Sequence, residues 1–158
     1  MENTRYYIAY GSNLNKAQMH WRCPDAKVIG TAELKDWRLL FKGSKSGAYL
    51  TIEKEDGGSV PVAVWSVSER DEQMLDRYEG FPVFYYKTEL PVTVKGIKTG
   101  KPRHLTAFAY IMHEDRPEGI PSKQYIQICA EGYRDFGFDL NILADAVWNI
   151  KEDGNENE

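Results

Sequence analysis

The sequence has few of the residues that build disulfide frameworks and metal sites. Its two cysteines, Cys23 and Cys129, are 106 residues apart and fit no Cys-x-x-Cys or Cys/His spacing. We therefore expect two reduced, buried thiols, and neither disulfides nor a zinc site. The three histidines, His20, His104 and His113, are scattered along the chain and have no second ligand at helical spacing. No metal is expected.

Long apolar runs and an excess of positive charge are also absent. The longest apolar run, residues 60–65, contains Pro61, and it is far shorter than the roughly 20 residues that cross a bilayer. The first residues include an acid where a signal peptide has basic residues. Twenty basic and 24 acidic side chains give a net charge of −4, which does not favour general attraction to phosphates. We expect a cytoplasmic protein with no membrane span and no nucleic-acid partner.

What remains is the composition of a compact folded domain. The chain has 158 residues, of which 42% are hydrophobic and 13% aromatic, and this length suits a single core. We predict one domain over residues 1–150. Residues 151–158 contain four acids, one lysine and no apolar residue, so we predict a disordered acidic tail there.

Residue patterns predict more strand than helix. Ser68 and Asp71 have the spacing of a capping box, and Gly80 is placed to end the helix that they begin. Glycines 57–58 and 96–100 are predicted hairpin turns. Together these signals indicate an α+β domain with a mostly antiparallel, curled sheet. The predicted strands are residues 5–10, 27–34, 37–41, 49–53, 60–67, 85–94 and 105–111, and the predicted helices are residues 15–22, 68–79, 122–132 and 139–148.

The first candidate for chemistry is the segment Tyr10-Gly11-Ser12-Asn13-Leu14, where a predicted buried strand breaks into a loop. Glycine there allows a positive φ and a close approach of the backbone. Successive amide donors, with the side chains of Ser12 and Asn13, could then hold a carboxylate or an amide oxygen. A strand-ending turn with an N-capping Ser or Asn explains the same residues.

The second candidate is Glu79, the last residue of a predicted helix. The negative end of the helix dipole and the neighbouring Tyr78 and Phe81 disfavour its charged form. Such a carboxylate is a stronger base than a solvated one and suits general-base catalysis near neutral pH. The alternative is an exposed carboxylate at a helix end.

The third candidate is Tyr125, one turn inside a helix that Pro121 and Ser122 are predicted to begin. A core aromatic residue with a satisfied hydroxyl explains it equally.

The three segments together resemble the γ-glutamylcyclotransferase-like family, which includes AIG2-like and butirosin-pathway members. The resemblance rests on Tyr-Gly-Ser-Asn-Leu, Leu-Asp-x-x-Glu-Gly and Pro-Ser-x-x-Tyr, which occur here in the family's order. Further likeness extends it over roughly residues 6–148. It implies a small, mixed, mostly antiparallel β-barrel-like sheet with a few flanking helices.

The resemblance also implies a reaction. In this family the substrate's α-amine attacks its own γ-carbonyl, and 5-oxoproline is released from a γ-glutamyl amide. Because the reacting groups are already linked, the enzyme folds the substrate into position and moves protons. No cofactor or metal is implied.

The family's functional residues map onto this chain one by one. Glu79 matches the catalytic glutamate, which acts as general acid/base. A further tyrosine is expected on the strand after Glu79; Tyr85 and Tyr86 compete for this position, and spacing favours Tyr86. The residues implied to bind substrate are Tyr7, Tyr10, Gly11, Ser12, Asn13 (as a brace of the turn), Tyr86 and Tyr125.

Several points stay open from the sequence. The group beyond the scissile amide is either an amino acid or an amine, and the protein is either a monomer or a homodimer. The leading alternative is a non-catalytic module that binds a glutamate-like metabolite in the same pocket. A third reading is an adaptor that works through the basic residues between Lys95 and His104.

Overall fold

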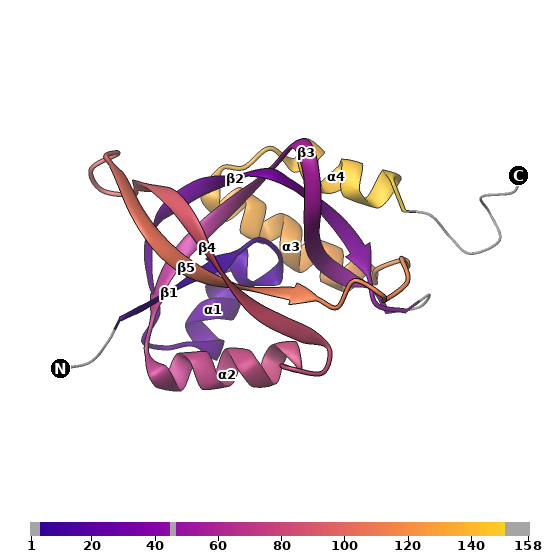
Figure 1. The fold of residues 1–158 in the computed structure, drawn as a ribbon, viewed down its shortest axis with the longest axis horizontal. Coiled ribbons are helices and arrows are strands. Elements are labelled where there is room, and N and C mark those ends of the chain that lie inside the picture. The colour runs from indigo at the N-terminus through magenta and orange to yellow at the C-terminus, as the bar shows by residue number, and fades with distance from the viewer. Residues whose placement is uncertain (1–3, 45–46, 151–158) are drawn as a thin grey trace, which may run out of the picture.

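The computed structural model describes residues 4–44 and 47–150 (Figure 1). The tail predicted over residues 151–158 lies outside this range. Five strands and four α-helices, with one short 3-10 helix, make up the described chain. In chain order they are β1 (Arg5–Ala9), η1 (Ser12–Leu14), α1 (Lys16–Arg22), β2 (Lys27–Lys42), β3 (Tyr49–Val67), α2 (Glu69–Glu79), β4 (Tyr85–Gly96), β5 (Pro102–Met112), α3 (Lys123–Phe136) and α4 (Leu140–Trp148).

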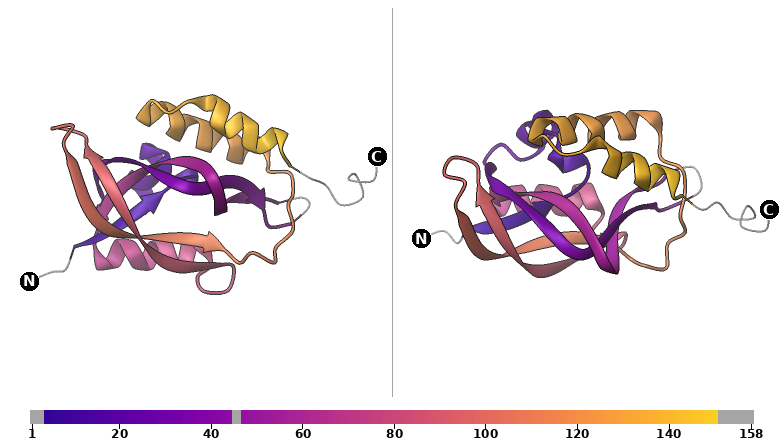
Figure 2. Two further views of the ribbon diagram at one scale, coloured as in Figure 1. Left: turned by 45° about the horizontal axis from the view of Figure 1, so that its top comes forward. Right: turned by 90° about the horizontal axis from the view of Figure 1, so that it is seen from above.

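The strands close into a barrel in the order β1-β3-β2-β4-β5. Strand β1 pairs in parallel with β5 at Tyr7 and Phe108, and the other pairings are antiparallel. Helix α2 covers one side of the barrel, and α3 and α4 lie together on the opposite side (Figure 2). The predicted α+β class, with a mixed and mostly antiparallel barrel-like sheet, is confirmed.

The prediction of a hairpin at Gly57–Gly58 is wrong. Strand β3 runs through these glycines and pairs with β2 on both sides of them. The register jumps from the pair Lys35 and Ser59 to the pair Trp37 and Lys54, so four residues of β3 face Asp36 alone. This bulge bends both strands and merges the predicted short strands into two long ones.

Both glycines are needed at the bulge. Gly57 has a φ of 82°, and a Cβ on Gly58 would lie 2.4 Å from the carbonyl oxygen of Trp37. The Gly57 amide donates to Asp36 Oδ1 at 3.0 Å. The second predicted turn is confirmed, because β4 and β5 form a hairpin around residues 97–101 in which Gly96 N donates to Lys101 O.

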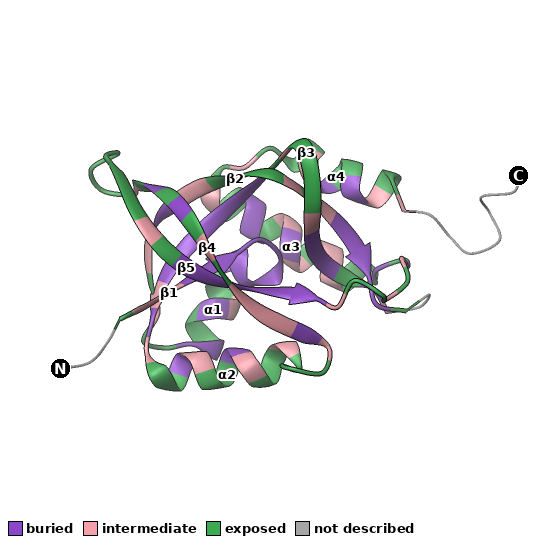
Figure 3. Ribbon diagram, in the orientation of Figure 1, coloured by how far each residue is buried: buried purple, intermediate pink, exposed green. Residues whose placement is uncertain are grey.

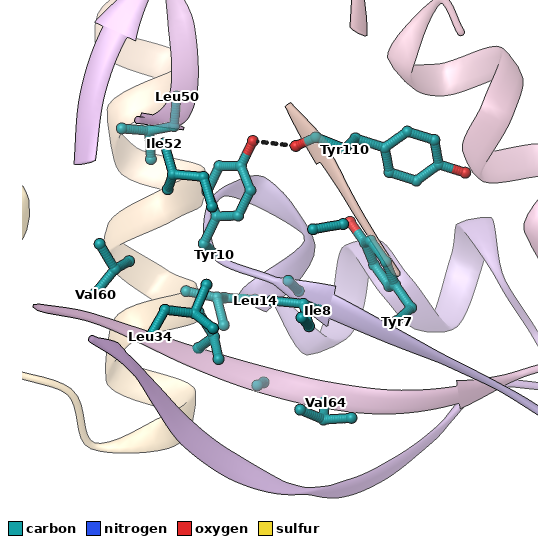
Figure 4. Close-up of a cluster of buried hydrophobic side chains, with 14 of the residues drawn as sticks. Tyr7, Ile8, Tyr10, Leu14, Leu34, Leu50, Ile52, Val60, Val64 and Tyr110 are labelled. Atoms are coloured by element: carbon teal, nitrogen blue, oxygen red, sulfur yellow. Dashed lines mark hydrogen bonds between the residues drawn. The ribbon is translucent and has the colours of Figure 1, made fainter. Parts of the chain in front are cut away.

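The buried residues of the core come from all five strands and from each of the four α-helices (Figure 3). Tyr7, Ile8 and Tyr10 project from β1 and the segment after it into this core (Figure 4). The hydroxyl of Tyr10 donates to the carbonyl of Tyr110 at 2.6 Å, which satisfies a polar group deep in the barrel. Cys23 and Cys129 are both free and buried, as expected.

The ends of helix α2 follow the sequence. Asp71 N donates to Ser68 Oγ and Ser68 N donates to Asp71 Oδ2, which completes the predicted capping box. Gly80 ends the helix with a φ of 66°. The helix therefore stops immediately after Glu79. Within residues 4–44 and 47–150, no helix is long and apolar enough to cross a membrane.

Candidate active site

The loop after β1 presents backbone amides at one end of the barrel. The first internal hydrogen bond of η1 runs from Leu14 N to Gly11 O, so the amides just before Leu14 have no acceptor within the helix. Gly11 has a φ of −129°, and the positive φ considered from the sequence is wrong. Its small size matters instead: a Cβ on Gly11 would lie 3.3 Å from Leu50 Cβ and 3.4 Å from Tyr125 Oη.

The side chain of Asn13 links this loop to β1 and to α1. Its Nδ2 donates to the hydroxyl of Tyr7 at 2.9 Å, and its Oδ1 accepts from Nη1 of the buried Arg22. Arg22 also donates to Gln18 Oε1. Loop, strand β1 and helix α1 are therefore fixed to each other by side-chain hydrogen bonds.

Helix α3 contacts the end of this loop through Asn15 and Gly132. Asn15 caps α1 through its Oδ1, while its Nδ2 donates to the carbonyl of Ile128 and to Glu131 on α3. Gly132 allows the close contact, because a Cβ there would lie 2.6 Å from Asn15 N and 2.7 Å from Leu14 Cβ.

Glu79 meets this loop from the end of α2. The preceding residue, Tyr78, shares a 2.9 Å hydrogen bond with Ser12, and Glu79 is half-buried. Loss of hydration raises the pKa of Glu79 from the usual 4.5 to about 8, and the positive charge of Arg22 opposes this rise. The raised pKa agrees in direction with the sequence argument, but burial is its main cause.

Tyr125 closes the site from α3. Ser122 caps this helix by accepting from Tyr125 N at 3.1 Å. The Tyr125 hydroxyl accepts from Leu50 N at 3.1 Å and faces Gly11. The tyrosine is thus both part of the packing and part of the site.

The structure places Tyr85, and not Tyr86, at the site. Tyr85 is buried, lines the cavity described below, and donates through its hydroxyl to Leu50 O at 2.9 Å. Tyr86 points the other way, where its hydroxyl donates to Glu114. Neighbouring residues of a strand face opposite sides, and the spacing argument chose the wrong one.

A cavity of about 300 Å³ opens where these elements meet, and a narrow recess of about 20 Å³ continues from it into the barrel. The residues that line both spaces are Ser12, Glu79, Tyr85 and Tyr125. The outer cavity is completed by Tyr49, Arg77, Tyr78, Gly80 and Phe84. The inner recess is completed by Tyr7, Tyr10, Gly11, Asn13, Leu50 and Tyr110. Of the residues predicted to be catalytic or to bind substrate, all except Tyr86 therefore line one or both of these spaces.

Sequence reasoning missed several residues of the site. The buried Arg22 is not among the residues predicted from the sequence. Tyr110 lies in the predicted strand 105–111 and Phe84 lies directly before the predicted strand 85–94, and nothing in their local pattern marks them as lining residues. In the described residues, no cluster of three or more His, Cys, Asp or Glu side chains is arranged to hold a metal.

The amino-acid sequence is similar to those of known γ-glutamylcyclotransferases. The family described as γ-glutamyl cyclotransferase, AIG2-like, matches residues 7–127. The human γ-glutamylcyclotransferase is 31% identical over 148 residues, covering 88% of this chain and 75% of the relative. The bovine γ-glutamylcyclotransferase is 32% identical over 143 residues, covering 85% and 72%.

Solved structures agree. A γ-glutamyl cyclotransferase structure is similar with a TM-score of 0.77 and 28% identity, covering 96% of this chain and 90% of that one. YkqA from Bacillus subtilis shares the fold with a TM-score of 0.76 at 20% identity, covering 96% of this chain and 56% of its own. The chain therefore belongs to the γ-glutamyl cyclotransferase, AIG2-like family and is an enzyme of the γ-glutamylcyclotransferase type.

Proposed function

We propose that this enzyme releases 5-oxoproline from a γ-glutamyl amide, with Glu79 as general acid/base. The observation that carries the proposal is the position of Glu79, which lines both the outer cavity and the inner recess beside the loop of Gly11–Asn13. A pKa of about 8 makes its carboxylate a useful base near neutral pH.

The reaction moves two protons and exchanges one bond for another. Glu79 removes a proton from the substrate's α-ammonium group, and the amine nitrogen then attacks the γ-carbonyl carbon. The carbonyl oxygen becomes an oxyanion, and the carboxylic acid of Glu79 gives this first proton to the leaving nitrogen. The regenerated carboxylate then takes the second proton from the ring nitrogen. When the oxyanion collapses, the old C–N bond breaks and the new C–N bond remains in the five-membered ring. 5-Oxoproline and the amine leave, and the second proton passes from Glu79 to the amine.

The loop amides and the tyrosines have supporting roles in this scheme. Free amides at the start of η1 are suited to hold either the glutamyl carboxylate or the developing oxyanion. Tyr85 and Tyr125 donate to and accept from the backbone of Leu50, respectively, so both rings are fixed in place beside Glu79. Such fixed walls favour a folded substrate in which the amine lies near the carbonyl.

The outer cavity is where the leaving group would lie. Its walls are mostly aromatic, and among its nine lining residues Arg77 is the one basic side chain and Glu79 the one acid. This balance favours a leaving group that carries a carboxylate, as in a γ-glutamyl amino acid, over a leaving group that is a simple cationic amine.

The test is to incubate the metal-free protein with matched γ-glutamyl dipeptides and γ-glutamyl amines and to measure 5-oxoproline. The proposal expects release, and faster release from the dipeptides. No release from any compound, together with measurable binding of glutamate or 5-oxoproline, would instead support a non-catalytic binding module.

A further inference from the structure

Asp76, the aspartate of the Leu-Asp-x-x-Glu-Gly segment, has no role in the reaction scheme above. It lies on α2 one helical turn before Glu79. Its Oδ1 accepts from the hydroxyl of Tyr110 at 2.6 Å and lies 2.9 Å from Nζ of Lys87. Two elements of the barrel, β5 and β4, therefore reach the same oxygen atom.

Lys87 and Tyr110 are themselves direct partners across the antiparallel β4–β5 pair. Side chains at such paired positions project from the same face of the sheet. The backbone of this pair is held in the barrel, and it offers Asp76 one cation and one hydroxyl at a fixed spacing. Burial and the bond to Asp76 raise the pKa of Tyr110, so its hydroxyl stays protonated and donates.

The same pair also contacts the chain on the other side of Glu79. The ammonium of Lys87 lies 4.6 Å from the ring centroid of Phe81, and the ring of Phe81 packs edge-on against Tyr110 at 6.4 Å. Asp76 precedes Glu79 by three residues and Phe81 follows it by two. The turn that carries Glu79 is thus tied to Lys87 and Tyr110 at both ends.

Tyr110 also connects these contacts to residues 10–13, the loop after β1 that is proposed to bind substrate and is called the substrate loop below. Its backbone carbonyl accepts from the hydroxyl of Tyr10 at 2.6 Å (Figure 4), and Tyr10 is the residue before Gly11. A continuous path therefore runs from Lys87 through Asp76 and Tyr110 to Tyr10. It joins the helix that supplies the base to the loop that supplies the amide donors.

We propose that Asp76 is a positioning residue, which through Lys87 and Tyr110 sets the place of Glu79 relative to the Tyr10–Asn13 loop. This inference rests on the proposed function of Glu79. A displacement of a reacting group by about 1 Å can cost on the order of a hundredfold in rate, so a tie at both ends of the turn has a direct catalytic value.

A different ion pair on the same helix provides the control. Glu72, one turn before Asp76, bonds Lys87 at 2.7 Å and Arg5 at 3.1 Å. It clamps α2 to the barrel but lies two turns from Glu79. If Asp76 serves only to hold the helix down, loss of Glu72 and loss of Asp76 should have the same kind of effect.

The experiment compares Asp76→Ala, Asp76→Asn and Glu72→Gln in thermal unfolding and in 5-oxoproline release. We expect Asp76→Ala to lower kcat about ten- to a hundredfold with a much smaller change in KM. Asp76→Asn retains an acceptor for Tyr110 and should recover part of that loss. Glu72→Gln should lower Tm without a comparable fall in kcat. A fall in kcat that simply follows the fall in Tm across all three variants would overturn the inference.

A crystal structure of Asp76→Ala separates this inference from the proposed function. If the wild type releases no 5-oxoproline, the proposed function fails, but the structure still reports whether the Glu79 carboxylate has moved relative to Ser12. We expect it to move. A Glu79 carboxylate in its original place would overturn the positioning role of Asp76 whether or not the wild type is active.

Discussion

The guanidinium of Arg22 lies over the ring of Tyr78, 3.5 Å from the ring centroid. Tyr78 directly precedes Glu79 in the last turn of α2. Arg22 also bonds Asn13 of the substrate loop. One buried cation therefore contacts both halves of the site. Its charge favours the ionised form of Glu79 and opposes the loss of hydration that raises the pKa of that carboxyl to about 8.

Replacing Arg22 should move the pH dependence of the reaction. If ionised Glu79 is the base, kcat/KM of the wild type rises with pH through a pKa of about 8. In Arg22→Met this rise should shift to higher pH, because the opposing positive charge is gone. Arg22→Lys keeps the charge and should keep the wild-type profile more closely. The check is a pH series of kcat/KM for the three proteins, and coincident profiles for Arg22→Met and the wild type would refute the role of this charge.

The raised pKa of Glu79 also makes stability depend on pH. Below pH 4.5 the carboxyl is neutral in both the folded and the unfolded chain, and its ionisation does not lower the free energy of unfolding. Between about pH 5 and 8 the unfolded chain loses this proton and the folded chain keeps it, so the free energy of unfolding falls as pH rises. The glutamine in Glu79→Gln cannot ionise. The difference between the Tm of this variant and the Tm of the wild type should therefore increase steadily in favour of the variant from pH 5 to pH 8. A Tm difference that stays constant from pH 5 to pH 8 would contradict the shift.

Gly132 should be required for activity because it lets α3 approach the substrate loop. In Gly132→Ala the new Cβ would overlap Asn15 N and Leu14, which should cost about 1–3 kcal/mol of stability and displace the loop. Gly137→Ala is the matched control: that glycine has a φ of 71° and a Cβ there would meet no atom within 4 Å. It should lose about 1 kcal/mol through backbone strain and retain its kcat/KM. Equal kcat/KM in the two variants would argue against this role of Gly132.

Tyr85 and Tyr86 offer a matched pair of neighbouring side chains. Tyr85→Phe removes a hydroxyl that is held by Leu50 O at the cavity wall, so the wall loosens and kcat/KM should fall several-fold. Tyr86→Phe removes a hydroxyl that bonds Glu114 away from the cavity, and kcat/KM should stay essentially unchanged. Steady-state kinetics of the two variants decide the point, and a larger effect in Tyr86→Phe would return that residue to the site.

Local signals in the sequence predicted the four α-helices and most of the strand positions, and the resemblance to the family pointed to seven of the residues that line the cavity and the recess. The prediction of a helix that Ser68 begins and Gly80 ends is confirmed, because helix capping depends only on residues that are close in the sequence. The hairpin predicted at Gly57–Gly58 is wrong because two adjacent glycines suit either a hairpin turn or a bulge. Which of the two forms depends on how β2 pairs with β3. The residues of the three motifs converge because each one ends or begins an element at the same end of the barrel.

The rest of the site depends on contacts between distant segments. Tyr110 enters the recess because β5 pairs with both β4 and β1, and its bond to Asp76 joins residues 34 positions apart. The burial of Arg22 follows from the packing of α1 against the turn of Glu79. Neither has a local pattern that could have identified it. The single domain over residues 1–150, the cytoplasmic location and the choice between monomer and homodimer stay predictions.

The most direct test of the account is 5-oxoproline release by Glu79→Gln, measured with the best γ-glutamyl substrate of the wild type. This substitution keeps the shape of the side chain and removes the base, so turnover should fall by at least about a hundredfold, while binding of the substrate is largely retained. Glu69→Gln, the same change at the exposed start of α2, should leave turnover unchanged. Turnover by Glu79→Gln close to that of the wild type would contradict the assignment of Glu79 as the catalytic acid/base.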